Sequence, residues 1–326
     1  MGNNAIIDNP NTSTLDLTTH GSDFLWAVCA LMLLTDLIVI FWMMTLPKGT
    51  RVFHQISALI LTTASIAYFT MASDLGSTPI VPTFIRGAAR SSPRTADGQI
   101  TRSIWYVRYI DWTVTTPLLL LEILLCTGLP LSDIVTTVFF DLVMIIGGLV
   151  GALITSRYKF GYFVGACFAM FYVFYILLWE GRVSAKRLSP GVGKSYTTSA
   201  SILVFLWTLY PVAWILADGI NYIATDSEMV FYGILDVLAK PVFCLFHLYQ
   251  LRSEDLTVLH LQSGKVSDGV GGHYDQKRSY ELNGGPTTSV SSVGAGTGLA
   301  APVRPDNARR RTSERRAALE EQAGAQ

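Results

Sequence analysis

Seven long apolar segments constrain the fold of this chain more than any other feature. Each is close to the ~20 residues that an α-helix needs to cross the hydrocarbon core of a bilayer. Because a backbone in lipid must satisfy its own hydrogen bonds, the segments are predicted to be helices. They cover roughly residues 22–46, 51–73, 104–127, 131–154, 160–181, 197–217 and 228–251. The chain is therefore predicted to be an all-α membrane protein, a bundle of seven transmembrane helices.

The composition supports this prediction and disfavours several other classes of protein. Hydrophobic residues make up 50% of the chain and charged residues 15%, whereas a soluble domain is about a quarter charged. The 24 basic residues balance the 24 acidic ones, so the net charge does not indicate a nucleic-acid partner. The four cysteines stand singly in apolar runs. This placement predicts buried thiols and neither disulfides nor a metal site.

The distribution of positive charge predicts the topology. Seven spans put the two termini on opposite sides of the membrane. The predicted cytoplasmic loops hold Lys48, Arg51, Arg182, Lys186, Arg187 and Lys194, and the outer loops Arg86, Arg90, Arg94, Arg102, Arg157 and Lys159. The tails decide the orientation, because the first 47 residues contain no Lys or Arg and residues 252–326 contain ten. We predict an extracellular segment at 1–21, the helical domain at 22–251 and a disordered cytoplasmic tail at 252–326.

Charged residues inside the predicted spans mark the candidate functional site, because a charge in a bilayer is costly and usually functional. In the third span, Arg108, Asp111, Thr115 and Glu122 share one helical face, since eleven residues bring Glu122 back to within about 20° of Asp111. The two carboxyl groups lie roughly 16 Å apart along the helix axis. The span therefore carries acidic groups at two depths of the membrane.

A lysine lies deep in the seventh span. Lys240 follows Asp236 by four residues, one helical turn, and lies on the same face. An unpaired ammonium there would lose its charge, but Asp236 and Asp111 together could keep a cation charged. A buried ion-pair cluster that only fixes helix packing is the structural alternative. A buried lysine is also the residue type that forms Schiff bases with aldehydes.

Aromatic residues cluster in the same spans. Trp207, Tyr210 and Trp214 are spaced by three and four residues and share a helical face. Trp112 and Tyr68 lie in the third and second spans. Such a stripe on its own is typical of a protein core. Beside a buried lysine, it predicts a slot for a long, flat, apolar ligand.

Three motifs carry a resemblance to a known family. They are RYIDWTVTTPLLLLE at 108–122, WTLYPVAW at 207–214 and LDVLAK at 235–240. In this order and on these spans they resemble those of the microbial (type I) rhodopsins, within the fungal branch of the bacteriorhodopsin family. The resemblance covers residues 22–251 and leaves out both tails. It implies a seven-helix bundle that holds all-trans retinal on a lysine Schiff base.

The resemblance also implies roles for individual residues. Lys240 corresponds to the retinal lysine, Asp111 to the primary proton acceptor and Asp236 to the second counterion, with Arg108 beside them. Glu228 and, more loosely, Asp218 resemble proton-release acids near the outer ends of their helices. The expected walls of the retinal slot are Tyr68, Trp112, Thr115, Thr116, Leu119, Met144, Gly148, Trp207, Tyr210, Pro211 and Trp214. Asp141 matches a buried carboxyl near the ionone ring.

One position departs from the pattern of the best-known haloarchaeal pumps. The cytoplasmic proton donor is an Asp in those proteins, and Glu122 stands at that position here. A carboxyl in the apolar LLLLE stretch should be neutral in the dark, and it could therefore donate a proton from the cytoplasmic side. Asp111, charged, and Glu122, neutral, would then give the site a direction.

These observations predict a light-driven outward proton pump in the plasma membrane, and no enzyme. The alternative is a photosensory rhodopsin with a slow photocycle that signals to a partner through the tail. A ligand-gated receptor is disfavoured because no DRY-type motif ends the third span and no NPxxY follows Lys240. A chloride pump would lack the acid at Asp111. Membrane lipid, protons and a second copy of the chain are the other expected partners.

Overall fold

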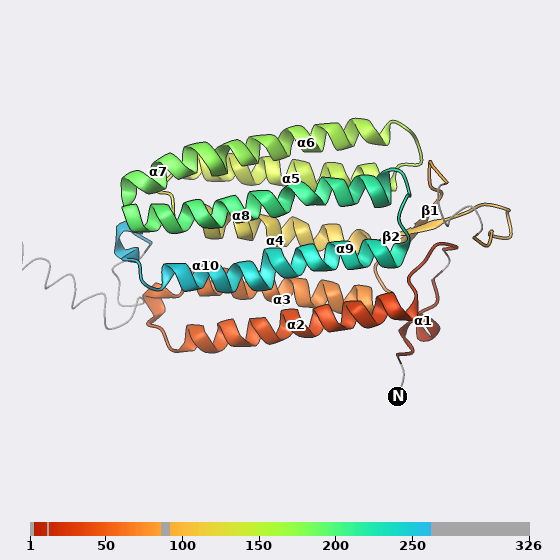
Figure 1. The fold of residues 1–326 in the computed structure, drawn as a ribbon, viewed down its shortest axis with the longest axis horizontal. Coiled ribbons are helices and arrows are strands. Elements are labelled where there is room, and N and C mark those ends of the chain that lie inside the picture. The colour runs from red at the N-terminus through yellow and green to blue at the C-terminus, as the bar shows by residue number, and fades with distance from the viewer. Residues whose placement is uncertain (1–2, 12, 86–91, 262–326) are drawn as a thin grey trace, which may run out of the picture. The chain divides into compact units, whose positions relative to one another are not determined.

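The computed structural model describes residues 3–11, 13–85 and 92–261 (Figure 1). Most of the predicted tail, residues 262–326, lies outside the described residues, as do Arg86 and Arg90. The elements at the end of the bundle where the N-terminus lies are α1 (Ala5–Asp8), β1 (Thr78–Ile80) and β2 (Arg102–Ile104). Short 3₁₀ turns lie at Lys48–Thr50 and Leu256–Leu259.

Seven helical rods form the bundle in the described part of the chain. The first four are α2 (Thr19–Met44), α3 (Val52–Ala72), α4 (Tyr106–Leu124) and α5 (Leu131–Leu153). The fifth joins α6 (Lys159–Tyr175), a π turn (Ile176–Glu180) and α7 (Gly181–Leu188). The sixth is α8 (Pro190–Trp214) with a π turn at Ile215–Gly219, and the seventh joins α9 (Thr225–Val237), a π turn (Leu238–Val242) and α10 (Phe243–Leu251).

The predicted fold class is confirmed. Six rods are long and apolar enough to cross a membrane. The remaining one, α4, carries Arg108, Asp111 and Glu122 within 19 residues, and all three are buried. Its charges therefore face the interior of the bundle, where partners can neutralise them, and its outer face stays apolar.

Neighbouring rods in the sequence pack side by side. α2 lies against α3, α3 against α4, α4 against α5 and α5 against α6, while α9 packs on both α8 and α2 (Figure 1). The outward surfaces carry large exposed apolar side chains, such as Phe41, Phe69 and Phe168. Such faces suit lipid, in which an exposed phenyl ring costs nothing. The buried polar residues are thus enclosed by a ring of helices.

The prediction of a long loop between the fifth and sixth spans was wrong. Helix α7 continues to Leu188, α8 begins at Pro190, and Ser189 alone joins them. Lys186 and Lys194 therefore lie on helices. The apolar pattern ends earlier because the bundle reaches beyond the hydrocarbon layer, where a polar helix such as GRVSAKRL is stable. Pro190 suits the first helical position, which needs no amide hydrogen.

The N-terminal segment and a two-stranded hairpin cover one end of the bundle. Strands β1 and β2 pair antiparallel, and Leu15 pairs with Arg102 as a third, parallel backbone partner. The amide of Leu15 donates to the carbonyl of Thr101 (2.9 Å), and the amide of Ser103 donates to Leu15 (3.1 Å). This pairing fixes the β2 backbone. Arg102 and Lys159, which were expected in loops, instead lie in a strand and at the start of a helix.

The contact between α7 and α8 depends on a glycine. A Cβ atom at Gly193 would lie 2.6 Å from the Cα of Lys186, a main-chain atom that cannot move aside. We expect Gly193→Ala to lower the free energy of unfolding by about 1–3 kcal/mol, the usual cost of overpacking. Thermal unfolding in detergent, followed by circular dichroism, measures this. Gly165→Ala is the matched control, since nothing lies within 4 Å of its added Cβ. Equal midpoints for the two variants would contradict the close approach.

Candidate functional site

The centre of the site is the ammonium group of Lys240, in the π turn between α9 and α10. Its Nζ lies 2.6 Å from Asp111 Oδ2 on α4 and 3.2 Å from Asp236 Oδ1 on α9. All three side chains are 1–2% exposed. Pro241 has no amide hydrogen to give to the helix, which accords with a local departure from α-helical bonding. The turn directs Lys240 into the bundle.

The two carboxyl groups differ in their other partners. Asp236 accepts hydrogen bonds from the hydroxyls of Tyr68 and Tyr210, both at 2.7 Å. Asp111 Oδ1 is buried and has no hydrogen-bond partner among the described residues. Asp236 is thus held as an anion by two donors. Asp111 keeps an oxygen that is free to take a proton.

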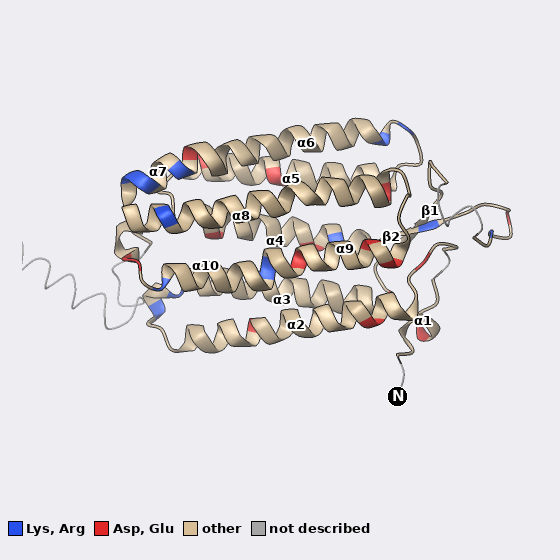
Figure 2. Ribbon diagram, viewed as in Figure 1, with Lys and Arg blue, Asp and Glu red and all other residues tan. Residues whose placement is uncertain are grey.

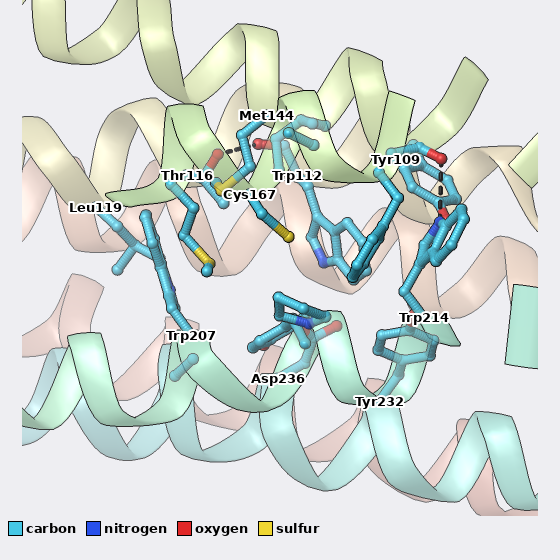
Figure 3. Close-up of a pocket in the computed structure, with 18 of the residues that line it drawn as sticks. Tyr109, Trp112, Thr116, Leu119, Met144, Cys167, Trp207, Trp214, Tyr232 and Asp236 are labelled. Carbon is cyan, nitrogen blue, oxygen red and sulfur yellow. Dashed lines mark hydrogen bonds between the residues drawn. The ribbon is translucent and has the colours of Figure 1, made fainter. Parts of the chain in front are cut away.

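An elongated apolar cavity begins at Lys240. The empty space among its lining residues, part of which is open to the outside of the bundle, is about 730 Å³. Of the residues predicted for the slot, the walls include Trp112, Thr116, Leu119, Met144, Gly148, Trp207, Tyr210, Pro211 and Trp214. Figure 3 shows Trp112, Trp207 and Trp214 standing around this space. Trp214 is fixed by a bond from its Nε1 to the carbonyl of Gly148 (3.1 Å).

The cavity has the properties that a polyene aldehyde requires. A primary amine lies at one end, the walls are apolar or aromatic, and Gly148 contributes no side chain. A Cβ atom there would lie 3.4 Å from the Tyr109 ring, at ordinary contact distance. The chain's own residues therefore fit retinal.

Two predicted wall residues lie elsewhere. Tyr68 and Thr115 do not line the cavity. The Tyr68 hydroxyl donates to Asp236, and the Thr115 hydroxyl donates to the main-chain carbonyl of Asp111 (2.9 Å). Residues that the sequence reasoning missed also line the cavity, namely Tyr109, Ile145, Phe163, Ala166, Cys167, Met170, Tyr232 and Ala239. Several lie on α5 and α6, which carry no charged or tryptophan-rich motif. Asp141 accepts from Thr116 (2.7 Å) and so ties α5 to α4 behind the slot.

Glu122 lies on α4 in a closed apolar region. Its side chain is 0% exposed. One carboxyl oxygen accepts a hydrogen bond from Ser57 on α3, and the other faces the thiol of Cys244 at 4.0 Å. No cation pairs with this carboxyl in the part of the chain that the structure describes. An unpaired buried carboxyl is far more stable in its neutral form.

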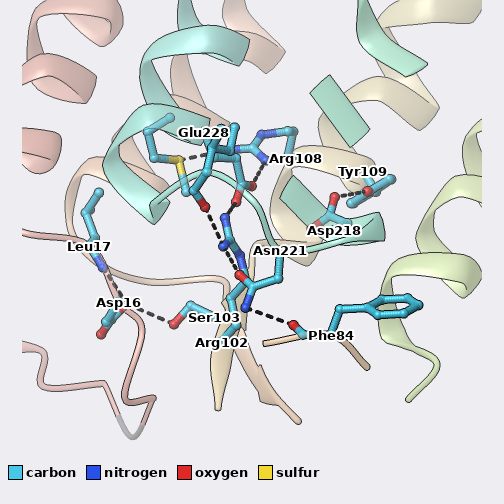
Figure 4. A network of polar contacts seen from close by, with 12 residues as sticks. Asp16, Leu17, Phe84, Arg102, Ser103, Arg108, Tyr109, Asp218, Asn221 and Glu228 are labelled. Atoms are coloured by element: carbon cyan, nitrogen blue, oxygen red, sulfur yellow. Dashed lines mark hydrogen bonds and ion pairs between the residues drawn. The ribbon is translucent and has the colours of Figure 1, made fainter. Parts of the chain in front are cut away.

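A second charged cluster, around Glu228, lies near strand β2 and the start of α9 (Figure 4). Glu228 is 0% exposed, and its two oxygens bind Arg108 at 2.6 Å and Arg102 at 2.7 Å. Arg108 also covers the ring of Tyr232 at 4.2 Å. Arg102 in turn contacts the side chain of Asn221. Two guanidinium groups thus hold one carboxylate.

Asp218 belongs to a neighbouring set of contacts. It accepts from the hydroxyl of Tyr109 (2.9 Å), and Lys159 donates to its main-chain oxygen (2.6 Å). Closer to the surface, Asp16 accepts from Ser103 (2.8 Å) and lines an outer cavity together with Arg102. Burial raises the pKa of Asp16, although hydrogen bonds oppose the shift. Acidic groups therefore continue from the cluster to the outer surface.

Two functional candidates escaped the sequence reasoning. Arg102 was assigned to a loop because only its place between spans was considered, although it precedes Arg108 by six residues. His247 follows Lys240 by seven residues, which places it on nearly the same helical face. The helical period could have found this histidine. No local sequence pattern predicts the ion pair between Arg102 and Glu228, because the two residues are far apart in the sequence.

Comparisons with known proteins agree with this geometry. Residues 20–253 match the family model described as bacteriorhodopsin-like protein. The chain is 45% identical to Protein FDD123 of Trametes versicolor over 93% of its own length and 100% of the relative's.

Solved structures extend the likeness to the fold. The light-driven proton pump Coccomyxa subellipsoidea Rhodopsin CsR is 35% identical with a TM-score of 0.66, covering 72% of this chain and 98% of the other. The light-driven proton pump of Leptosphaeria maculans is 32% identical with a TM-score of 0.64, covering 72% and 96%. The chain therefore belongs to the bacteriorhodopsin-like family of integral membrane proteins, which bind retinal through a Schiff base on a lysine.

Proposed function

We propose that this protein is a light-driven outward proton pump with retinal on Lys240. One observation carries the proposal: three carboxyl groups, Glu122, Asp111 and Glu228, lie at successive depths of the bundle, with Lys240 beside the middle one. The similar proteins from Coccomyxa subellipsoidea and Leptosphaeria maculans, both described as light-driven proton pumps, also support it.

The first transfer takes place between Lys240 and Asp111. Retinal bound to Lys240 would supply light-driven isomerisation beside this pair. Asp111 lies 2.6 Å from Nζ and has an oxygen without another partner, so it can take the Nζ proton. Asp236 is held by Tyr68 and Tyr210 and remains an anion throughout.

Release to the outside involves Arg108 and Glu228. When Asp111 becomes neutral, the attraction of Arg108 toward the centre of the bundle weakens, and the guanidinium moves further toward the outer surface. Glu228, ionised between two arginines, guides the proton outward through its carboxylate. Asp218, bound by Tyr109, is the second acid on this side.

Glu122 returns a proton to Lys240 from the opposite side. Its carboxyl is neutral at rest because nothing charged stabilises its anion. It lies on the same face of α4 as Asp111, roughly 16 Å along the axis. Transport is directional because protons leave Lys240 toward Glu228 and are replaced from Glu122 on the opposite side.

The charge pattern supports an orientation with the N-terminus outside. Figure 2 shows basic residues along α7 and at the neighbouring end of α8. That end of the bundle carries Lys48, Arg51, Arg182, Lys186, Arg187, Lys194 and Arg252. Among the described residues, the opposite end carries fewer basic residues, Arg94, Arg102, Arg157 and Lys159, and it also carries Asp8, Asp16, Asp23, Asp74, Asp97 and Asp226. Basic residues favour the cytoplasm, so α7 lies inside and residues 252–326 form a cytoplasmic tail; we place the protein in the plasma membrane.

The decisive test is the light-induced pH change of cells or vesicles that contain the pigment. A pump acidifies the outside for as long as light lasts, and a protonophore abolishes the signal. Lys240→Ala is the matched control and should give neither a visible absorption band nor a pH change. A slow photocycle without sustained transport would instead support a photosensor that signals through its tail.

Replacing Asp111 should stop transport while the pigment still forms. Asp111→Asn removes the acceptor and one counter-charge, so we expect a red-shifted dark absorption band and a loss of transport of at least about a hundredfold, the lower end of what a positioned proton-transfer group contributes. Visible spectra and the vesicle assay measure both effects. Asp133→Asn, in the first turn of α5, is the control. Continued pumping by Asp111→Asn would move the acceptor role to Asp236.

Replacing Glu122 should slow the return of the proton to Lys240. Glu122→Gln keeps the shape and the bond from Ser57 but has no proton to give. We expect recovery of the visible band to slow by about a hundredfold and to become dependent on external pH, while added azide restores its rate. Flash photolysis measures the recovery. An unchanged rate would mean that water from the cytoplasm already supplies the proton.

A further inference from the structure

A buried histidine lies beyond Glu122 on the cytoplasmic side that we propose. His247 is 0% exposed and follows Lys240 by seven residues in α10. The reaction derived above gives it no role, although Glu122 must regain a proton after each donation. Glu122 is fully buried and has no solvent-exposed surface. Some group must therefore connect it to the cytoplasm.

Hydrogen bonds lead from His247 toward the surface. Its Nδ1 lies 2.9 Å from Ser199 Oγ, and Gln250 Nε2 donates to the same oxygen at 3.0 Å. Gln250 is half-buried in the last turn of α10, while Ser199 is fully buried. The contacts thus form a continuous polar chain from the end of the bundle to the imidazole.

The other side of the ring faces Glu122. His247 Nε2 lies 3.9 Å from the thiol of Cys126, which donates to the main-chain carbonyl of Glu122 at 3.7 Å. That carbonyl also faces the imidazole. No hydrogen bond joins the imidazole to the Glu122 carboxyl group within residues 3–11, 13–85 and 92–261. At rest, the polar chain is therefore interrupted between the imidazole and the Glu122 carboxyl group.

These bonds allow a tautomer of the ring that suits proton transfer. The Ser199 hydroxyl can accept from Gln250 and at the same time donate its own hydrogen to Nδ1, and in that arrangement Nδ1 acts as an acceptor. The neutral ring consequently carries its hydrogen on Nε2, toward Cys126 and the Glu122 carbonyl. An imidazole in this state can receive a proton from the surface side and release another on the Glu122 side.

The surroundings keep this ring in place. Phe243 stacks on it with ring centroids 5.8 Å apart and planes at 6°, and Phe53 packs edge-on at 6.1 Å. The titratable groups nearby are Glu122 from α4, Cys126 from the turn that follows α4, Tyr196 from α8 and Cys244 from α10, while α3 contributes Phe53. None is a permanent anion that would hold an imidazolium, so the charged ring is short-lived.

We propose that His247 takes up a proton from the cytoplasmic side and passes it to Glu122 after Glu122 has given its own to Lys240. The proton enters at Nδ1 through Ser199, and the Nε2 proton leaves for the carboxylate of Glu122. The ring then rotates or exchanges its proton to reset. Transfer requires His247 Nε2 and the Glu122 carboxylate to approach within hydrogen-bonding distance. The negative charge of the deprotonated Glu122 favours this approach. The proposal rests on the donor role of Glu122.

The test separates donation by Glu122 from its refilling. His247→Gln keeps a hydrogen-bonding group beside Ser199 but cannot accept and release a proton. The Glu122-to-Lys240 step, followed by visible absorbance in a single turnover, should be unchanged. Uptake from the medium, followed with a pH-indicator dye, and the return of the protonated Glu122 carboxyl band in infrared spectra should both slow by about a hundredfold. Both should also become proportional to the external proton concentration.

A second histidine provides the control. His54 is also buried, lies near the start of α3 and has no hydrogen-bond partner for either ring nitrogen in the described structure. His54→Gln should leave uptake unchanged. If His247→Gln fails to fold, Ser199→Ala interrupts the same chain and should slow uptake with a normal visible spectrum.

The outcomes distinguish this proposal from the one on which it rests. Slow uptake with normal donation supports the role of His247. Unchanged uptake in both His247→Gln and Ser199→Ala would overturn it, and so would equal slowing of donation and uptake, which indicates a packing role. If Glu122→Gln has no effect on recovery, the donor assignment itself fails, and the inference about His247 fails with it.

Discussion

The structure depends on one buried cation, the Lys240 ammonium, and on the two carboxylates that neutralise it. In an interior without bulk water, removing one partner of such a pair typically costs about 3–5 kcal/mol, so the elements that supply Asp111 and Asp236 cannot drift apart. The hydroxyls of Tyr68 and Tyr210 extend the cluster to α3 and α8. A single charged group thereby fixes the mutual position of four rods. The same proximity makes the cluster reactive, since a proton shared at 2.6 Å needs only a small reorientation to change its owner.

The outer cluster repeats this principle with the signs reversed. There one carboxylate, Glu228, neutralises two arginines, and neither arginine is more than 3% exposed. Arg108 thus faces an anionic site on each side: the carboxylates around Lys240 and Glu228. A cation between two such sites responds to a change of charge at either one. A change of charge at Lys240 would therefore affect Arg108 and Glu228 even though no unbroken chain of hydrogen bonds joins them to Lys240.

Much of this architecture could be predicted from the sequence, for physical reasons. Span length and hydropathy define a transmembrane helix locally, and the helical period brings Asp111 and Glu122 to one face. The family motifs identified the cavity around Lys240. What escaped prediction depends on contacts between distant segments. The α7–α8 connection at Ser189 lies outside the hydrocarbon layer, where hydropathy carries no signal. Arg102 acquires its role only when β2 pairs with Leu15 and faces Glu228, and Tyr109 or Phe163 become cavity walls only after the rods pack.

The N-terminal segment has a consequence for how this protein can be modified. Leu15 bonds the main chain on both sides of Arg102, and successive residues of a strand point to opposite faces. A shift of one residue in this register would turn the guanidinium away from Glu228. A fusion partner or epitope tag is therefore best attached ahead of residue 3, whereas trimming residues 13–18 would release Arg102. Such a truncated form would leave the cavity around Lys240 as it is, while the contact between Arg102 and Glu228 would loosen. The N-terminal segment thus offers a place where the position of Arg102 can be changed separately from the retinal-binding cavity.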